Sequence, residues 1–193
     1  MQKITLLLLF VPLLFLACSK EFDPSHPKDG KSVVLYLDHY KEGTNFRVFD
    51  NKNRSNQYYT YVSDFPGREL GYFYVINAKV VKTPSGIMDA PSYYFKYTST
   101  IHKYKFEDAQ PFNVSILNTG SYPSMSLLSK RNDSLFYDLQ YLSPINAAVY
   151  KSIDSVYEMG KTVAGEEQIR TRKLTVKHDP GNFGKGFIVY GVQ

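Results

Sequence analysis

The chain has 193 residues, of which 43% are hydrophobic, 16% aromatic and 21% charged, so it has enough apolar material for a core and lacks the composition of a disordered protein. Its formal charge is +5, but basic residues are spread along the chain and cluster only at RTRK (170–173), which argues against nucleic acid as a partner. With 17 Tyr, 13 Phe and no Trp, the composition favours strands over helices.

The first segment has the layout of a signal peptide. A short positively charged start, MQK (1–3), precedes the apolar run ITLLLLFVPLLFLA (4–17). This run is shorter than the ~20 residues that a helix needs to cross a bilayer. We therefore expect residues 1–17 to be a signal peptide that is removed.

The only cysteine, Cys18, directly follows this run. The stretch LFLAC (14–18) resembles the lipobox of bacterial lipoproteins, in which a small residue, here Ala17, precedes a cysteine that becomes the lipid-modified N-terminus. The sequence departs from the usual pattern at Phe15, where the family has Leu. The resemblance implies a covalent diacylglycerol and an N-acyl lipid on Cys18, a membrane anchor and no other cofactor.

A lipidated Cys18 leaves the mature chain without a thiol, which excludes cysteine catalysis, zinc–thiolate sites and disulfides. Residues 18–30 are polar and contain prolines, and are expected to form a flexible tether. Their CSKE opening is similar to that of outer-membrane lipoproteins of Bacteroidetes, in which acidic residues behind the cysteine direct export to the cell surface. Because Phe22 separates Glu21 from Asp23, surface exposure and a periplasm-facing location both stay open.

Two further triplets, Asp133-Ser134-Leu135 and Asp154-Ser155-Val156, resemble the acceptor motif of O-glycosylation in the same phylum. This resemblance implies O-glycosylation at Ser134 and Ser155.

Residues 31–193 are expected to form a single β-rich domain. Short aromatic and β-branched segments alternate with turn residues such as Asn, Asp, Gly and Pro, which is typical of strands. The predicted strands are 32–37, 46–49, 57–62, 71–81, 92–99, 102–106, 112–117, 134–142, 169–177 and 186–192.

One segment, residues 143–160, has a helical pattern instead. Ile145, Val149, Ile153 and Val156 recur at spacings of four and three, which places them on one face of a helix. Ser143 is expected to cap this helix, with Pro144 in the first turn and Gly160 at the end. The predicted fold is therefore mostly β, an antiparallel sandwich or barrel-like sheet with one amphipathic α-helix.

The best candidate for a binding surface is HKYKF (102–106). In a strand, Lys103 and Lys105 would lie on one face and Tyr104 on the other. Tyrosine rings suit sugars and protein partners, and lysines suit anions. The alternative is an ordinary strand, with the lysines in solvent and the tyrosine in the core.

No motif indicates an enzyme. The histidines His26, His39, His102 and His178 form no pair at metal-ligand spacing, and are interpreted as solitary surface residues or residues satisfied in the core. GNFGKG (181–186) lacks the Ser or Thr of a phosphate-binding loop and is predicted to be a hairpin loop. Adjacent acids such as Glu107 and Asp108 show no facing pair for glycoside hydrolysis, and no Gly-x-Ser-x-Gly motif occurs.

We therefore expect a lipid-anchored protein of the bacterial cell envelope that acts as a non-enzymatic binding or assembly module, with a glycan or an envelope protein as partner. Three alternatives stay open. They are a structural subunit of an envelope complex, a haem binder that joins two distant histidines, and a hydrolase whose site is built from distant residues.

Overall fold

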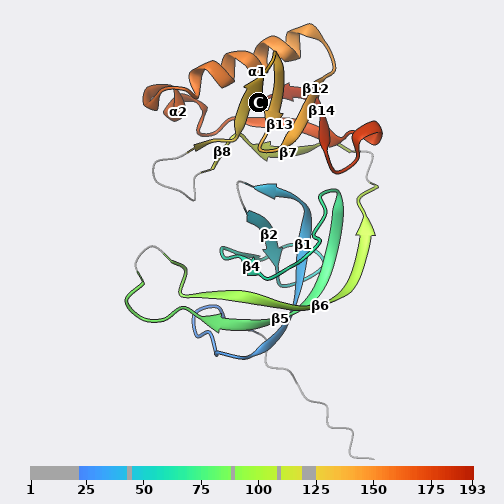
Figure 1. The fold of residues 1–193 in the computed structure, drawn as a ribbon. Coiled ribbons are helices and arrows are strands. Elements are labelled where there is room, and N and C mark those ends of the chain that lie inside the picture. Colours follow the sequence, from blue (N-terminus) through green and yellow to red (C-terminus); the bar gives the residue numbers. More distant parts are fainter. Residues whose placement is uncertain (1–21, 43–44, 88–89, 108–109, 119–124) are drawn as a thin grey trace, which may run out of the picture.

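The computed structural model describes residues 22–42, 45–87, 90–107, 110–118 and 125–193. Cys18 and the predicted signal peptide lie outside these residues. The described chain forms two six-stranded sheets, which lie one above the other along the molecule (Figure 1). We call the lower one sheet A and the upper one sheet B.

Sheet A contains the first six strands, in the order β3-β2-β1-β5-β6-β4. Their bounds are β1 Ser32–Glu42, β2 Asn45–Phe49, β3 Gln57–Tyr58, β4 Val62–Ser63, β5 Tyr72–Lys82 and β6 Tyr93–Lys105. The pairings are antiparallel except that of β4 with β6. Alternate side chains such as Leu35, Leu37, Ile76 and Phe95 are buried in one cluster, as the period of two predicts.

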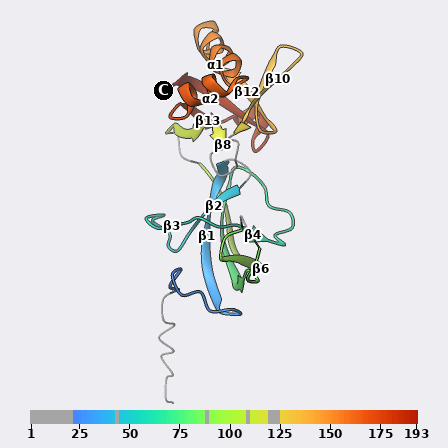
Figure 2. The ribbon, with the colours of Figure 1, turned by 90° about the vertical axis from the view of Figure 1, so that its left-hand side faces the viewer.

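Sheet A is curled into a half-barrel (Figures 1 and 2). The register of β5 and β6 shifts between Val75 and Ile76 and again between Asn77 and Ala78. Such bulges bend a strand and increase its twist, which accounts for the curl.

Sheet B is built by the second half of the chain, in the order β10-β11-β12-β14-β13-β7. The bounds are β7 Phe112–Ser115, β10 Leu128–Arg131, β11 Ser134–Tyr137, β12 Gln140–Pro144, β13 Lys173–His178 and β14 Gly186–Val192. β8 (Leu117–Asn118) and β9 (Met125–Ser126) form a separate small ribbon, and η1 spans Pro180–Asn182.

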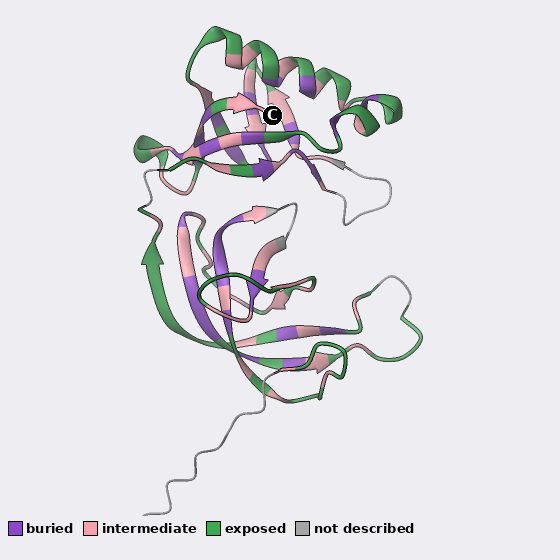
Figure 3. Cartoon of the chain, turned by 180° about the vertical axis from the view of Figure 1, so that it is seen from behind, coloured by how far each residue is buried: buried purple, intermediate pink, exposed green. Residues whose placement is uncertain are grey.

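Two helices, α1 (Ala147–Met159) and α2 (Val163–Ile169), connect β12 to β13. They form the end of the molecule farthest from sheet A (Figure 2). Ile153 and Val156 of α1 are buried in one cluster with residues of sheet B that include Val176, Phe187 and Val189, while the outer side of the helix is exposed (Figure 3).

The mostly-β prediction is confirmed, with two sheets and two helices in place of the one helix expected. The boundaries differ in several places. The strand predicted for 32–37 continues to Glu42 as β1, and the strand predicted for 169–177 begins only at Lys173, because Ile169 belongs to α2. Residues 92–99 and 102–106 form one strand, β6, because a bulge continues the ladder between them. Residues 57–62 divide into β3 and β4, which lie at opposite edges of sheet A. Residues 134–142 are the hairpin of β11 and β12, which turns at Asp138 with a φ of 54°.

The predicted start of the helix is wrong. Ser143 and Pro144 belong to β12, and the N-cap is Asn146, whose side chain accepts a hydrogen bond from the backbone N–H of Val149 at 2.9 Å. The reason is the parallel pairing of β12 with β14, in which Ser143 lies opposite Ile188. This pairing crosses more than forty residues of sequence and leaves no local pattern. Gly160 ends the helix as predicted.

Residues 22–30, which belong to the predicted tether, contact sheet A. The ring of Phe22 makes edge contacts with Tyr58, Tyr93 and Phe95 at centroid distances of 5.3–5.6 Å. Farther along, the backbone N–H of Gly30 donates to Val80 O at 2.8 Å. The described chain thus begins in contact with the sheet, at the end where β1 starts.

Candidate binding site

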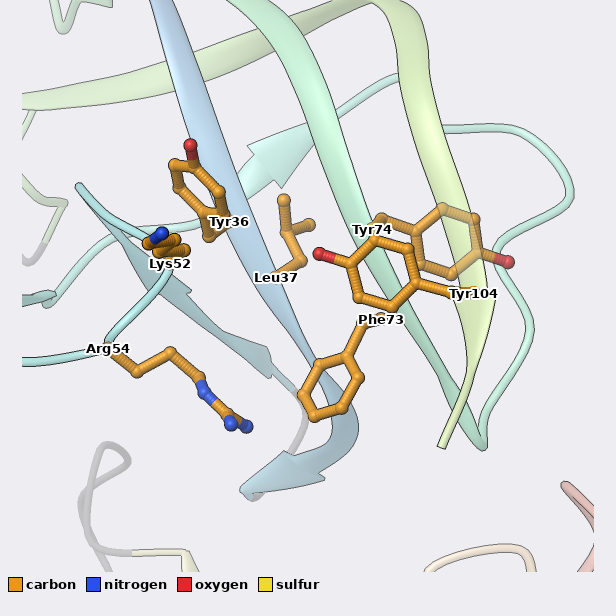
Figure 4. Close-up of a pocket in the computed structure, with 7 residues that line it drawn as sticks. All are labelled: Tyr36, Leu37, Lys52, Arg54, Phe73, Tyr74 and Tyr104. Atoms are coloured by element: carbon orange, nitrogen blue, oxygen red, sulfur yellow. The ribbon is translucent and has the colours of Figure 1, made fainter. Parts of the chain in front are cut away.

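A pocket of about 60 Å³ opens on sheet A, where β1 and β5 pass the loop between β2 and β3, and it reaches two residues of the sheet A core, Leu37 and Tyr74 (Figure 4). Strands β1 and β5 supply Tyr36 and Phe73, and β6 supplies Tyr104. The loop between β2 and β3 supplies Lys52 and Arg54, which lie across the opening from the aromatic side chains of β5 and β6. Leu37 and Tyr74 complete the lining.

The β2–β3 loop is held in place by its own Asn and Asp side chains. The Asn51 amide donates to Ser55 Oγ at 2.9 Å, and the Asn56 amide donates to Asp50 Oδ2 at 2.8 Å. Arg54 has a φ of 55°, and its backbone N–H donates to Asn51 O at 3.1 Å. These local bonds form the turn that carries both cations over the sheet.

Arg54 connects the pocket to a buried polar cluster. Its guanidinium lies 4.4 Å from the centroid of the Phe73 ring, and its Nη1 donates to Asp38 Oδ1 at 3.2 Å. Asp38 is only 2% exposed. Its other carboxylate oxygen lies 3.6 Å from Arg47 Nη1, and Arg68 Nη2 donates to its backbone carbonyl at 3.1 Å.

Burial raises the pKa of Asp38, while the hydrogen bond from the backbone N–H of His39 and the charges of Arg54 and Arg47 act to lower it. A buried carboxylate is stable only when such partners replace the lost water. Asp38 therefore serves to hold Arg54, and through it the loop, against the sheet.

Beside this carboxylate, His39 of β1 meets His178 of β13. His39 Nδ1 and His178 Nε2 are 2.8 Å apart, and His39 Nε2 is 3.5 Å from Asp38 Oδ1. Both rings are buried, and the His39 ring stacks on Phe106 at 3.7 Å and packs edge-on against Phe112 at 4.6 Å. Of the two interpretations that the sequence left open, these two histidines are residues satisfied in the core and not surface residues, and the fold pairs them with each other.

One assignment of tautomers fits the two contacts that His39 makes, with Asp38 and with His178. If His39 Nε2–H points to Asp38, then His39 Nδ1 accepts from His178 Nε2–H, and His178 Nδ1 carries a lone pair. His178 Nδ1 is buried and has no hydrogen-bond partner among the described residues. Burial lowers the pKa of His39 to about 2 and that of His178 to about 4, so both rings are neutral at physiological pH.

The geometry of this cluster does not suit the hydrolase alternative, which requires an acid of perturbed pKa in an open cleft. Asp38 has a raised pKa, but it and the two histidines are at most 7% exposed. Phe106 and Phe112 cover the histidines. A substrate therefore has no access to these groups in this conformation.

The histidine pair also does not suit axial ligation of haem. Two nitrogens that bind one metal from opposite sides lie about 4 Å apart, whereas a hydrogen bond already joins these two. Within the described ranges, no three His, Cys, Asp or Glu side chains lie close enough to hold a metal ion.

The structure places the three predicted binding residues on the two faces of β6. Tyr104 is 47% exposed and lies beside Phe73 in the pocket, with ring centroids 5.8 Å apart. On the other face, the Lys103 ammonium lies over the Tyr72 ring at 4.2 Å and pairs with Glu69. The Lys105 ammonium lies over Phe183 at 4.3 Å. The pocket thus contains Tyr104 and neither lysine.

The two predicted O-glycosylation sites differ in accessibility. Ser155 is exposed on α1, while Ser134 is half-buried at the start of β11. Cys18, the predicted lipidation site, lies outside the described residues.

Sequence reasoning did not identify Tyr36, Lys52, Arg54 and Phe73 as site residues. A local signal exists for two of them, because DNKNR (50–54) is a turn that carries two cations between aromatic strands. The contribution of Tyr36 and Phe73 depends on which face of sheet A stays open, and the order of the strands decides this.

Searches of protein-family models, curated proteins and solved structures find no match to this chain. Among the described residues, no helix is both long and apolar enough to span a membrane.

Proposed function

We propose that this protein is a lipid-anchored, non-enzymatic binding protein of the bacterial cell envelope, whose pocket on sheet A takes an acidic sugar unit of a glycan. The observation that carries the ligand class is the composition of the pocket. Two cations, Lys52 and Arg54, and four aromatic rings surround one opening, and the rings of Tyr36, Phe73 and Tyr104 are the accessible ones, since Tyr74 is buried.

The cations favour a carboxylate or sulfate group on the ligand. The Lys52 ammonium is exposed and has no ion pair in the part of the chain that the structure describes. Arg54 uses one nitrogen for Asp38, which fixes the guanidinium at the pocket. A charge-assisted hydrogen bond from a prepositioned cation is stronger than one between neutral groups.

The rings favour a flat, partly apolar surface such as a sugar ring. Tyr104 is half-exposed, and Tyr36 and Phe73 are partly buried, so each offers an accessible face or edge. A volume of about 60 Å³ admits a carboxylate or the edge of one ring. The rest of a larger glycan would lie over the surrounding surface.

Titration of the purified protein with glucuronate, with glucose as the neutral comparison, tests this proposal. We expect glucuronate to bind more tightly, and Lys52→Ala to weaken its binding about tenfold, equivalent to about 1.4 kcal/mol. Tyr104→Ala should weaken both sugars. Added salt should reduce only the difference between the two, because screening acts on the charges.

The matched controls are Tyr59→Ala and Lys151→Ala, which remove an exposed tyrosine and an exposed lysine outside the pocket. Neither should alter binding. Equal affinity for glucose and glucuronate would reject the acidic ligand, and unchanged binding by Tyr104→Ala would reject the pocket.

A second candidate function, a subunit of an envelope complex, is favoured by exposed apolar side chains on sheet B. Tyr141 on β12 is 41% exposed, and Ile145, which directly follows β12, is 50% exposed. Tyr190 on the neighbouring strand β14 is 37% exposed. Apolar side chains gathered on one surface are typical of a protein interface. In-cell cross-linking from Tyr141, with Tyr59 as the control position, would detect such a partner.

Protease treatment of intact cells would separate a surface location from a periplasm-facing one. Digestion of the protein would favour capture of external glycans. Protection until the outer membrane is opened would favour a partner in the periplasm.

A further inference from the structure

We propose that the end of sheet A where β1 begins is a membrane-contacting surface, which lies on the anionic headgroups of phospholipids. This inference rests on the lipid anchor of the proposed function. It adds an orientation, with sheet A next to the membrane and the helices of sheet B farthest from it.

The first observation is the short distance along the chain between the anchor and the folded protein. Phe22 is already packed against Tyr58, Tyr93 and Phe95. It follows Cys18 by four residues, and four residues of fully extended chain span at most about 14 Å. A lipid on Cys18 therefore keeps the surface around Phe22 close to the bilayer.

The second observation is that this surface lies at the end of sheet A farthest from the helices. β1 begins, β5 ends and β6 begins at this end, with Ser32 opposite Lys79 and Lys79 opposite Lys96. The start of β1 lies at the lower end of the molecule, while α1 and α2 lie at the upper end (Figures 1 and 2). The start of the described chain and the helices are thus at opposite ends of the long axis.

The third observation is the charge of this end. Lys79 and Lys96 are directly opposite each other on β5 and β6, so their side chains share a face, and both are exposed. Like charges in this position destabilise a sheet unless an anion lies between or above them. Lys96 Nζ lies 3.7 Å from Asp64 Oδ2, but Lys79 has no ion pair in the described parts of the chain.

Further lysines lie at the same end of sheet A. Lys31 O accepts from the backbone N–H of Val80 at 2.9 Å, Lys28 O accepts from that of Lys31 at 3.2 Å, and Lys82 ends β5. The nearby acids are partly engaged within the chain. Asp23 Oδ2 lies 3.0 Å from His26 Nδ1, and Asp29 Oδ1 accepts from the backbone N–H of Lys82 at 2.9 Å. Lysines near a membrane surface are attracted by anionic lipids.

The fourth observation is a rim of exposed tyrosines next to Phe22. Tyr59, which follows Tyr58 in the chain, is 89% exposed. Tyr61 is 39% exposed and stacks on Tyr94 with a centroid distance of 5.2 Å. Tyrosine is favoured at the headgroup level of a bilayer, because its ring is apolar and its hydroxyl is polar.

Site-specific fluorescence tests the orientation. In Ser32→Cys the new thiol lies at the proposed contact surface, and in the matched variant Ser152→Cys it lies on exposed α1. Because Cys18 is the only native cysteine and lipidation consumes it, each purified lipidated variant takes a single label. The labelled proteins are reconstituted in phosphatidylglycerol–phosphatidylcholine vesicles with a headgroup-bound quencher.

We expect quenching several-fold stronger at position 32 than at position 152. Lys79→Glu combined with Lys96→Glu should reduce quenching at position 32 several-fold, as should vesicles of phosphatidylcholine alone, while Lys151→Glu should leave it unchanged. Quenching that is equal at both positions, or stronger at 152, would overturn the orientation although the anchor stands. If the wild-type chain is not recovered with membranes and Cys18→Ala behaves identically, both the anchor and this inference are wrong.

Discussion

His39 on β1 and His178 on β13 are 139 residues apart in the chain, and a 2.8 Å hydrogen bond joins their rings where sheet A meets sheet B. Around this bond the aromatic rings of Phe106 and Phe112 complete the junction. Each sheet has its own buried cluster, and Tyr40 of β1 belongs to the cluster of sheet B. The histidine pair is therefore a polar contact within an otherwise aromatic joint.

This pair makes stability depend on pH. Burial lowers the pKa of His39, with the nearby His178, Arg54 and Arg47 adding to the effect, and burial lowers the pKa of His178 to about 4. An unfolded histidine has a pKa near 6.5, so the unfolded chain binds more protons below this pH. The free energy of unfolding should fall as the pH drops from about 7 towards 4. His178 alone contributes on the order of 3 kcal/mol, present above pH ~6.5 and lost by pH ~4.

Urea unfolding at a series of pH values measures this effect. His178→Phe keeps a ring of similar size without a proton site and should make the pH profile shallower but not flat, because burial still lowers the pKa of His39. The variant also lowers stability near pH 7 by leaving His39 Nδ1 without its partner. His26→Gln is the control, because the His26 side chain is 85% exposed. A wild-type profile that is flat between about pH 7 and 5 would contradict the burial of this pair.

Gly71 fixes a second contact near the same joint. Its φ is +84°, its N–H donates to His39 O at 2.7 Å and its carbonyl accepts from the N–H of Phe106 at 2.8 Å. An added Cβ would lie 2.5 Å from Cε1 of Phe183. We expect Gly71→Ala to destabilise the fold by about 2 kcal/mol more than a glycine substitution at positive φ in open space.

Gly67 provides that comparison, since its φ is +66° and nothing lies within 4 Å of its added Cβ. The difference between the unfolding free energies of Gly67→Ala and Gly71→Ala therefore isolates the contact with Phe183. Equal losses in the two variants would show that Phe183 moves aside at no cost.

The start of α1 can be tested with two substitutions three residues apart. Asn146→Ala removes the side chain that caps the helix at Val149 and should cost about 1 kcal/mol. Ser143→Ala should have a much smaller effect, since Ser143 lies in β12 and caps no helix. Thermal unfolding of the two variants decides between the positions, and a larger loss for Ser143→Ala would favour a helix that begins earlier.

Local patterns were sufficient for much of the fold. Aromatic and β-branched segments between turn residues identified most of the residues of β1, β5, β13 and β14, and Gly160 marked the end of α1. These features depend on side chains close in sequence. The division of residues 57–62 between β3 and β4 could not be predicted from local patterns. It arises because β3 pairs with β2, which precedes it in the chain, whereas β4 pairs with β6, which follows it.

The sequence by itself determined the mostly-β class and singled out Tyr104 on an open strand. Only the tertiary structure decided that Tyr104 meets Tyr36, Phe73, Lys52 and Arg54 around one pocket, and that Lys103 and Lys105 lie on the opposite face. It also decided that His39 and His178 form a pair. The physical reason is that a strand's pattern specifies which side chains share its own face, whereas the neighbours across that face come from strand order and loop placement, which are long-range choices.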